Sequence, residues 1–69
     1  MHDDRRFLRS LLDALIAERE DAQLLYIPRG EAGQRRMIRA LLDMRAPEPE
    51  GTALHAMIAR FDAAEPTDP

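Results

Sequence analysis

The sequence predicts a small all-α domain of three helices, packed as an orthogonal array or a bundle, with an extended segment between the first and second helices. Three stretches carry apolar residues at helical period, and Pro or Gly interrupts the chain between them. No two stretches alternate in the way that paired strands do. With 69 residues the chain has room for one domain. We place a single helical domain at residues 1–64 and a disordered polar tail at residues 65–69.

The first helix is expected from Asp3 to about Arg19. Asp3 and Asp4 favour a helix start, because acceptors and negative charge are stabilising at a helix N-terminus. Acidic residues at the other end oppose the helix dipole, so we expect the helix to fray before Asp21. Its apolar residues fall in two i, i+4 rows that form one wide stripe: Phe7, Leu8, Leu11, Leu12, Leu15 and Ile16.

A short apolar run at residues 24–28 follows the first helix and ends at Pro28. Pro28 disfavours helical geometry at Ile27, so we expect an extended crossover laid on the core. Whether this segment is strand or coil stays open, although no second stretch offers a strand to pair with it.

The second helix is expected from Glu31 or Ala32 to Met44, and an X-Pro-X-Pro stretch at residues 46–49 ends it. Thr52 is the expected N-cap of a third helix that runs from Ala53 to about residue 63. The buried side of the second helix is expected to comprise Met37, Ile38, Leu41, Leu42 and Met44. The apolar stripe of the third comprises Leu54, Met57, Ile58 and Phe61.

The expected core is small for the length of the chain. Of the residues counted as hydrophobic, 11 are Ala and only 20 have large side chains. Burial on this scale comes close to balancing the entropy of ordering the chain. Without Cys, neither a disulfide nor a thiolate zinc site can add stability, which leaves a partner surface. The core prediction comprises Phe7, Leu11, Ile38, Leu41, Leu42, Met57, Ile58 and Phe61.

Charge argues against indiscriminate binding to nucleic acids or membranes, since the net charge is −3 and the pI about 5.2. No apolar run approaches the roughly 18 residues of a membrane span, and the N-terminus does not resemble a signal peptide. We therefore expect a cytoplasmic protein. All 10 basic residues are Arg, which indicates either a GC-rich genome or selection for bidentate recognition of carboxylate or phosphate.

The residues that usually perform catalysis do not form a recognisable arrangement. The two histidines, His2 and His55, lack a second ligand at metal spacing, and Ser10 has no nucleophile-elbow motif around it. The three glycines do not form a phosphate-binding loop. We predict that the chain is not an enzyme and binds neither a metal nor another cofactor.

One arginine cluster offers a candidate binding site. Arg36 and Arg39 share an exposed face of the second helix with Arg35 at its edge. They either bind a carboxylate, a phosphate or an acidic partner surface, or form a solvated face with an Arg39–Asp43 pair. Arg45 is expected to cap or anchor the C-terminus of the helix. Methionines on the apolar stripes serve as core filler or, where exposed, as adaptable binding surface. The candidate binding residues are Arg36, Arg39, Arg45, Met44 and Pro47.

Residues 26–28 and 34–49 carry a distinctive pattern: Tyr-Ile-Pro, then an Arg-rich helix that runs into Leu-Leu-Asp-Met-Arg-Ala-Pro-Glu-Pro. This pattern resembles the N-terminal helical region that precedes the macro domain in bacterial zinc-dependent macrodomain protein-ADP-ribosylhydrolases, the group linked to a dedicated sirtuin. That family has an Ile-Pro and a Leu-Met-Asn-x-Arg-x-Pro-x-Pro-like sequence. The resemblance covers roughly residues 5–50 and is carried by Arg39, Leu41, Arg45, Pro47 and Pro49.

The sequence departs from the family pattern at Leu42 and Asp43, where Met-Asn is usual, and at Ala46, where Pro is usual. In that family the ADP-ribose pocket and the zinc ligands lie in the macro domain, so no catalytic residue is carried over to this chain. The resemblance implies a non-catalytic accessory module that packs on a macro domain or contacts the protein substrate of that enzyme.

Two other functions stay open. One is a free-standing homodimer with a regulatory or adaptor role, which would place the missing core at its own interface. The other is nucleic-acid binding through Arg35, Arg36 and Arg39, which the net charge of −3 and the scarcity of aromatic residues disfavour.

Overall fold

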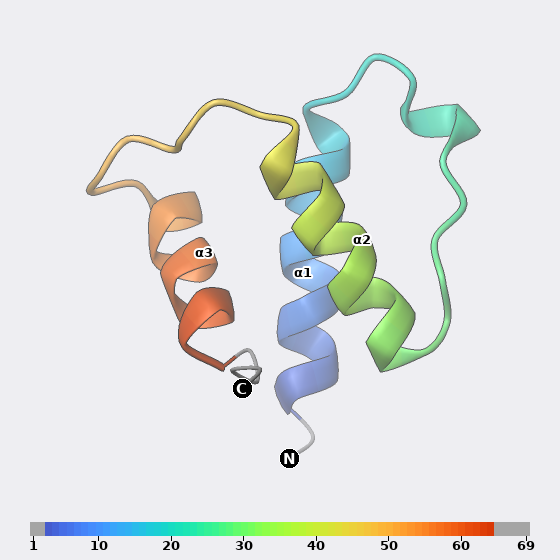
Figure 1. The fold of residues 1–69 in the computed structure, drawn as a ribbon, viewed down its shortest axis with the longest axis horizontal. Helices are drawn as coiled ribbons and strands as arrows, with labels where there is room; N and C mark the ends of the chain where they lie inside the picture. Colours follow the sequence, from blue (N-terminus) through green and yellow to red (C-terminus); the bar gives the residue numbers. More distant parts are fainter. Residues whose placement is uncertain (1–2, 65–69) are drawn as a thin grey trace.

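A computed structural model describes residues 3–64 and contains three α-helices and one short 3-10 helix (Figure 1). The helices are α1 (Asp3–Ala17), η1 (Ala22–Leu24), α2 (Glu31–Asp43) and α3 (Ala53–Ala64). The prediction of a small all-α domain with three main helices is confirmed. The segment between η1 and α2 is extended coil, and the described residues contain no strand. The tail at residues 65–69 lies outside the described part of the chain.

Helix α1 is the centre of the fold, because α2 and α3 each contact α1 more than they contact each other. In Figure 1, α1 and α2 run in the same direction and α3 runs in the opposite direction. The parallel arrangement of α1 and α2 depends on the long segment between residues 17 and 31, which returns the chain to the end where α1 began. The connector between α2 and α3 is shorter and reverses the chain at the other end.

Helix α1 ends at Ala17, before the acidic residues that oppose its dipole, as expected. The amides of Glu18 and Arg19 donate to the carbonyls of Leu15 and Ile16 at 3.3 and 2.9 Å, which tightens the last turn. Arg19 then forms a two-bond ion pair with Asp21 at 2.8 and 3.2 Å. This pair stabilises the turn that leads into η1, a helix that the sequence did not lead us to expect.

The crossover that follows η1 only partly covers the core. Ile27 packs against the buried cluster, as the prediction required. Leu24 and Tyr26 do not, since 85% and 79% of their surfaces are exposed. The prediction that this whole apolar run lies on the core is therefore wrong. Successive side chains of an extended segment point to opposite sides, so Ile27 can face inward only if Tyr26 faces outward.

The start of α2 is fixed by a close contact with the crossover. The side-chain amide of Gln34 donates to the Pro28 carbonyl at 2.9 Å and holds the crossover beside the first turns of α2. A Cβ placed on Gly33 would lie 2.7 Å from the Cβ of Pro28, closer than two carbons can approach. Only Gly at position 33 therefore allows this packing.

Helix α3 begins as predicted at Ala53. The amide of His55 donates to the Thr52 hydroxyl oxygen at 2.9 Å, which is the expected N-cap bond. The turn before it passes through Gly51 at a φ of 92°, a conformation that side-chain-bearing residues rarely adopt. The X-Pro-X-Pro stretch ahead of this turn, expected to be extended, contains neither helix nor strand.

The core differs from the prediction in which residues are fully buried. Because α1 lies between α2 and α3, both apolar rows of its stripe are buried. The predicted core omitted three leucines of these rows, Leu8, Leu12 and Leu15, which are all buried. Phe7, Leu42, Met57 and Ile58, which were expected in the core, are partly buried at its edge. Met44, expected on the buried side, is 64% exposed because α2 has ended at Asp43. The buried cluster comprises Leu8, Leu11, Leu12, Leu15, Ile38, Leu41 and Phe61.

Two arginines lie over aromatic rings at the edge of this core. The Arg60 guanidinium of α3 lies 4.2 Å from the ring centroid of Phe7 on α1. Arg39 of α2 lies 5.2 Å from the ring centroid of Phe61 on α3. Such cation–π contacts shield the rings from water and tie neighbouring helices together.

Among residues 3–64, no helix has both the length and the apolar character needed to cross a bilayer.

We expect Gly33→Ala to lower the free energy of unfolding by about 1–2 kcal/mol, because the new methyl group displaces Pro28. At an exposed position within a helix the preference is the opposite, because there Ala is more stable than Gly by about 1 kcal/mol. Ala40→Gly, on the exposed side of the same helix, is the matched control. Urea unfolding followed by circular dichroism measures both changes. A more stable Gly33→Ala variant would contradict the close contact.

Candidate functional site

A groove open to solvent lies where the end of α2, the connector and α3 meet. Its volume is about 280 Å³, just below the range of pockets that enclose a drug-sized ligand. The apolar part of its lining includes Leu42, Pro47 and Ile58, and charged side chains surround them. The lining comprises Arg39, Leu42, Asp43, Arg45, Ala46, Pro47, Glu48, His55, Ile58 and Asp62.

The structure brings together three of the five candidate binding residues, since Arg39, Arg45 and Pro47 all line this groove. Met44 precedes Arg45 in the chain and has an exposed side chain. Arg36 lies apart from the groove, exposed on α2. There it borders a shallow depression of about 430 Å³ together with Arg35, Arg39, Ala40 and Asp43.

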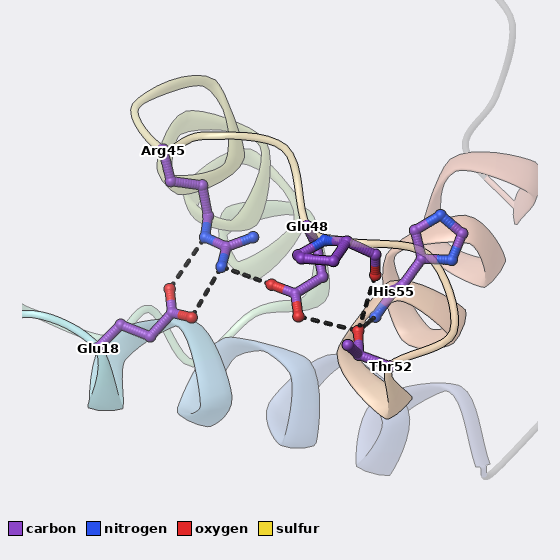
Figure 2. A network of polar contacts seen from close by, with 6 residues as sticks. Glu18, Arg45, Glu48, Thr52 and His55 are labelled. Atoms are coloured by element: carbon purple, nitrogen blue, oxygen red, sulfur yellow. Dashed lines mark hydrogen bonds and ion pairs between the residues drawn. The ribbon is translucent and has the colours of Figure 1, made fainter.

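Arg45 is the centre of a polar network that joins three segments (Figure 2). Its Nε and one Nη donate to the two carboxylate oxygens of Glu18 at 2.9 and 2.8 Å. The same Nη also donates to Glu48 at 2.8 Å. Arg45 was expected to cap or anchor the C-terminus of α2, and its guanidinium, just beyond that end, binds these two carboxylates. It thereby ties the end of α1 to the connector.

Glu48 extends the network to the start of α3. The Thr52 hydroxyl lies 2.8 Å from the second carboxylate oxygen of Glu48 and donates to it. Since the same hydroxyl oxygen accepts the His55 amide, Thr52 is both an N-cap and a link to Arg45 through Glu48. The connector is therefore held at Arg45, at Glu48 and at its junction with α3.

The charges in this network shift each other's protonation equilibria. The hydrogen bond from Arg45 is the main cause that lowers the pKa of Glu48 below its ordinary value, and the bond from Thr52 adds to it. The pKa of Arg45 is raised, mainly by its hydrogen bond to Glu48, against the opposing effect of burial. Both residues are therefore charged at neutral pH.

Arg39 joins α2 to α3 on the other side of the groove. Its Nη2 forms an ion pair with Asp62 at 2.6 Å, and its guanidinium lies over the Phe61 ring. The sequence interpretation considered Asp43, four residues away on the same helix, as the partner of Arg39. Asp62 was missed because its position beside α2 depends on how α3 packs.

The groove suits a partner surface with an apolar centre and a polar rim, the usual composition of protein interfaces. Arg45 and Glu48 are already bound to each other, and His55 is half buried at the edge. Of the residues that the sequence did not single out, Glu48 had a local signal, because it lies three residues after Arg45 and four before Thr52. Glu18 had none, since 27 residues separate it from Arg45.

Comparisons with known proteins found no family model, no curated protein and no solved structure similar to this chain.

We expect Arg45→Met to lower the free energy of unfolding by about 1–2 kcal/mol, because it leaves Glu18 and Glu48 without their shared cation. The Arg45 side chain is only 22% exposed, so solvent screens this interaction less than it screens a surface pair. Arg9→Met is the control, since Arg9 and Asp13 are 53% and 56% exposed and their pair should contribute less than about 0.5 kcal/mol. Equal losses of unfolding free energy in the two variants would contradict the role of Arg45 in holding Glu18 and Glu48 together.

Stability should fall in acid, partly through Glu48. Because folding lowers the pKa of this carboxyl from an ordinary 4.5, its contribution is fully present above that value and is lost as the pH falls through the lower folded pKa. Urea unfolding from pH 7 to pH 3 should show a difference between wild type and Glu48→Gln that is largest near neutrality and disappears in acid. A difference independent of pH would contradict the assigned cause.

Proposed function

We propose that this chain is a non-catalytic helical interaction module that binds a protein partner through apolar side chains left outside its own core. The observation that carries the proposal is the exposure of Leu24, Tyr26 and Met44 while only seven of the described residues are buried in the core. Single exposed apolar residues are common on protein surfaces. Here, however, three large ones remain in solvent while the core is undersized, which favours a surface that a partner completes.

Met44 is the exposed apolar residue that lies beside the groove in the chain. It caps the end of α2 between Asp43 and Arg45, which both line the groove, and its flexible thioether side chain adapts to different partner shapes. Pro47 adds a rigid apolar group in the connector. Since the Arg45 network already fixes the connector, a partner would meet a preformed surface and lose less entropy on binding.

The arginines have different roles in this proposal. Arg45 acts indirectly, because its guanidinium is occupied by Glu18 and Glu48 and orders the surface from within. Arg39 braces α3 through Asp62. Arg36 is exposed and lies beside the depression on α2, so it can set the orientation of an acidic partner.

The first partner to test is a macro domain of the zinc-dependent ADP-ribosylhydrolase type, or the protein substrate of such an enzyme. This choice rests on the resemblance carried by Arg39, Leu41, Arg45, Pro47 and Pro49. Three of these residues line the groove, the carbonyl of Pro49 accepts a hydrogen bond from Thr52 in the network, and Leu41 is part of the core. The pattern therefore coincides with the positions that shape the proposed surface.

Calorimetric titration of this chain with such a macro domain, prepared without its own N-terminal region, should show saturable binding. Met44→Glu should weaken binding at least about tenfold, because it places a charge in an apolar contact. Its own unfolding free energy should change by no more than about 0.5 kcal/mol, since Met44 is mostly exposed. Leu24→Ser and Tyr26→Ser, made together, show whether the crossover belongs to the same interface. No binding by the folded wild-type chain would exclude this partner.

A homodimer is the second candidate, because a second copy could cover the same exposed apolar residues. Light scattering over a concentration series, with helicity followed in parallel, separates the two candidates. A dimer that loses helix on dilution, and that Met44→Glu converts to monomer, would favour self-association. A stable monomer at all concentrations would exclude it.

A further inference from the structure

A third, smaller hollow lies at the opposite end of the α1–α2 pair from the groove. Its volume is about 130 Å³, and it is lined by Arg5, Arg9, Arg29, Glu31 and Gln34. Three of these five residues are arginines, although the whole chain carries a net charge of −3.

The parallel arrangement of α1 and α2 is the reason these residues meet. Arg5 and Arg9 are one turn apart near the start of α1. Arg29 immediately precedes the start of α2, and the crossover brings that start back beside the first half of α1 (Figure 1). The hydrogen bond from Gln34 to the Pro28 carbonyl, at 2.9 Å, fixes the backbone next to Arg29. The hollow is therefore bounded by two elements and a braced segment.

The charges around the hollow leave an excess of two positive groups. Arg9 is paired with Asp13 at 2.9 Å, and Glu31 is paired with Arg35 at 3.2 Å. Neither Arg5 nor Arg29 has a hydrogen bond or an ion pair with another residue of the described chain. Both arginines are exposed, and guanidinium groups bind oxyanions in a bidentate manner.

We propose that this hollow binds a phosphate group, held by Arg5 and Arg29 with Arg9 as a third donor. A phosphate monoester carries a charge of about −1.5 to −2, which matches the two arginines that have no partner among the described residues. The volume equals that of about four water molecules, so the hollow accommodates one tetrahedral oxyanion and not the larger body attached to it. A carboxylate carries half the charge and is a poorer match. The adjacent first turn of α2 adds favourable backbone polarity.

This site is separate from the proposed partner surface. The groove is formed at the end of α2 and the hollow at its beginning, so each can be altered without touching the other. The phosphate group could belong to a phosphorylated side chain of a protein or to a small metabolite. Both sources present the same dianion to the arginines.

The test is a titration of the full chain with inorganic phosphate at constant ionic strength, followed by amide chemical shifts in two-dimensional NMR. Saturable shifts are expected at the amides of residues 29–34. The variants Arg5→Gln and Arg29→Gln should each weaken binding by about tenfold, since each removes one charge-assisted contact. Asp13→Asn should strengthen binding by about twofold, because it releases Arg9 from its ion pair.

The control is Arg6→Gln, which removes the same charge from the next position on α1 but does not line the hollow. It should leave the affinity within about twofold of wild type. Equal weakening by Arg6→Gln and Arg5→Gln would overturn the proposal, because binding would then follow net charge alone. Shifts that grow with phosphate without saturating would also overturn it.

Phosphoserine and a nucleoside monophosphate, titrated in the same way, distinguish the sources. Tighter binding of phosphoserine than of inorganic phosphate would support the proposal and indicate that the ligand is a phosphorylated protein. Tighter binding of the nucleotide would support the proposal and indicate that the ligand is a small metabolite. Equal affinity for all three shows that the hollow recognises the phosphate group alone, as its volume indicates.

Discussion

The burial of both apolar rows of α1 is the constraint on which the rest of the structure depends. Leu8, Leu11, Leu12 and Leu15 are almost completely removed from water, and no single helix could cover them all. Helices α2 and α3 therefore lie on different sides of α1 and contribute Ile38, Leu41 and Phe61 to the same cluster. Because each packs mainly on α1, they meet each other less closely.

The groove and the polar network both follow from that arrangement. Where α2 and α3 diverge, apolar packing gives way to ion pairs, and Arg39 bridges the helices through Asp62 and the Phe61 ring. The connector crosses the same region and is held by Arg45 through two carboxylates. Polar contacts of this kind contribute modestly to stability, but they define where the surface lies.

The sequence was sufficient to predict the elements that local chemistry determines. The helical periodicity located the three helices to within about two residues. Thr52 and the prolines located the start of α3 and the non-helical connector before it. What could not be predicted depended on packing between distant segments. The partner of Arg45 at Glu18 lies 27 residues away, and Asp62 meets Arg39 only because α3 folds back along α1.

The errors in the predicted core have the same origin. An amphipathic stripe shows which side of a helix is buried, but not how many neighbours cover it. The leucines omitted from the prediction became core because two helices share α1, and Met44 became exposed because α2 stopped one residue earlier than expected. The candidate site was anticipated in part, since Arg39, Arg45 and Pro47 do converge. The carboxylates that order it were not anticipated.

The start of α1 and the end of α3 lie at the same end of the molecule, as Figure 1 and the contact between Phe7 and Arg60 show. A polypeptide attached after α3 would therefore emerge on the side away from the connector. To reach the groove it would have to travel back along the 12 residues of α3, a distance of about 18 Å. About six extended residues cover that distance. A flexible tether of roughly ten residues, whose average length matches that span, would give a covalently attached domain a high local concentration at the groove, so that a weak surface would be occupied more often than its affinity alone allows.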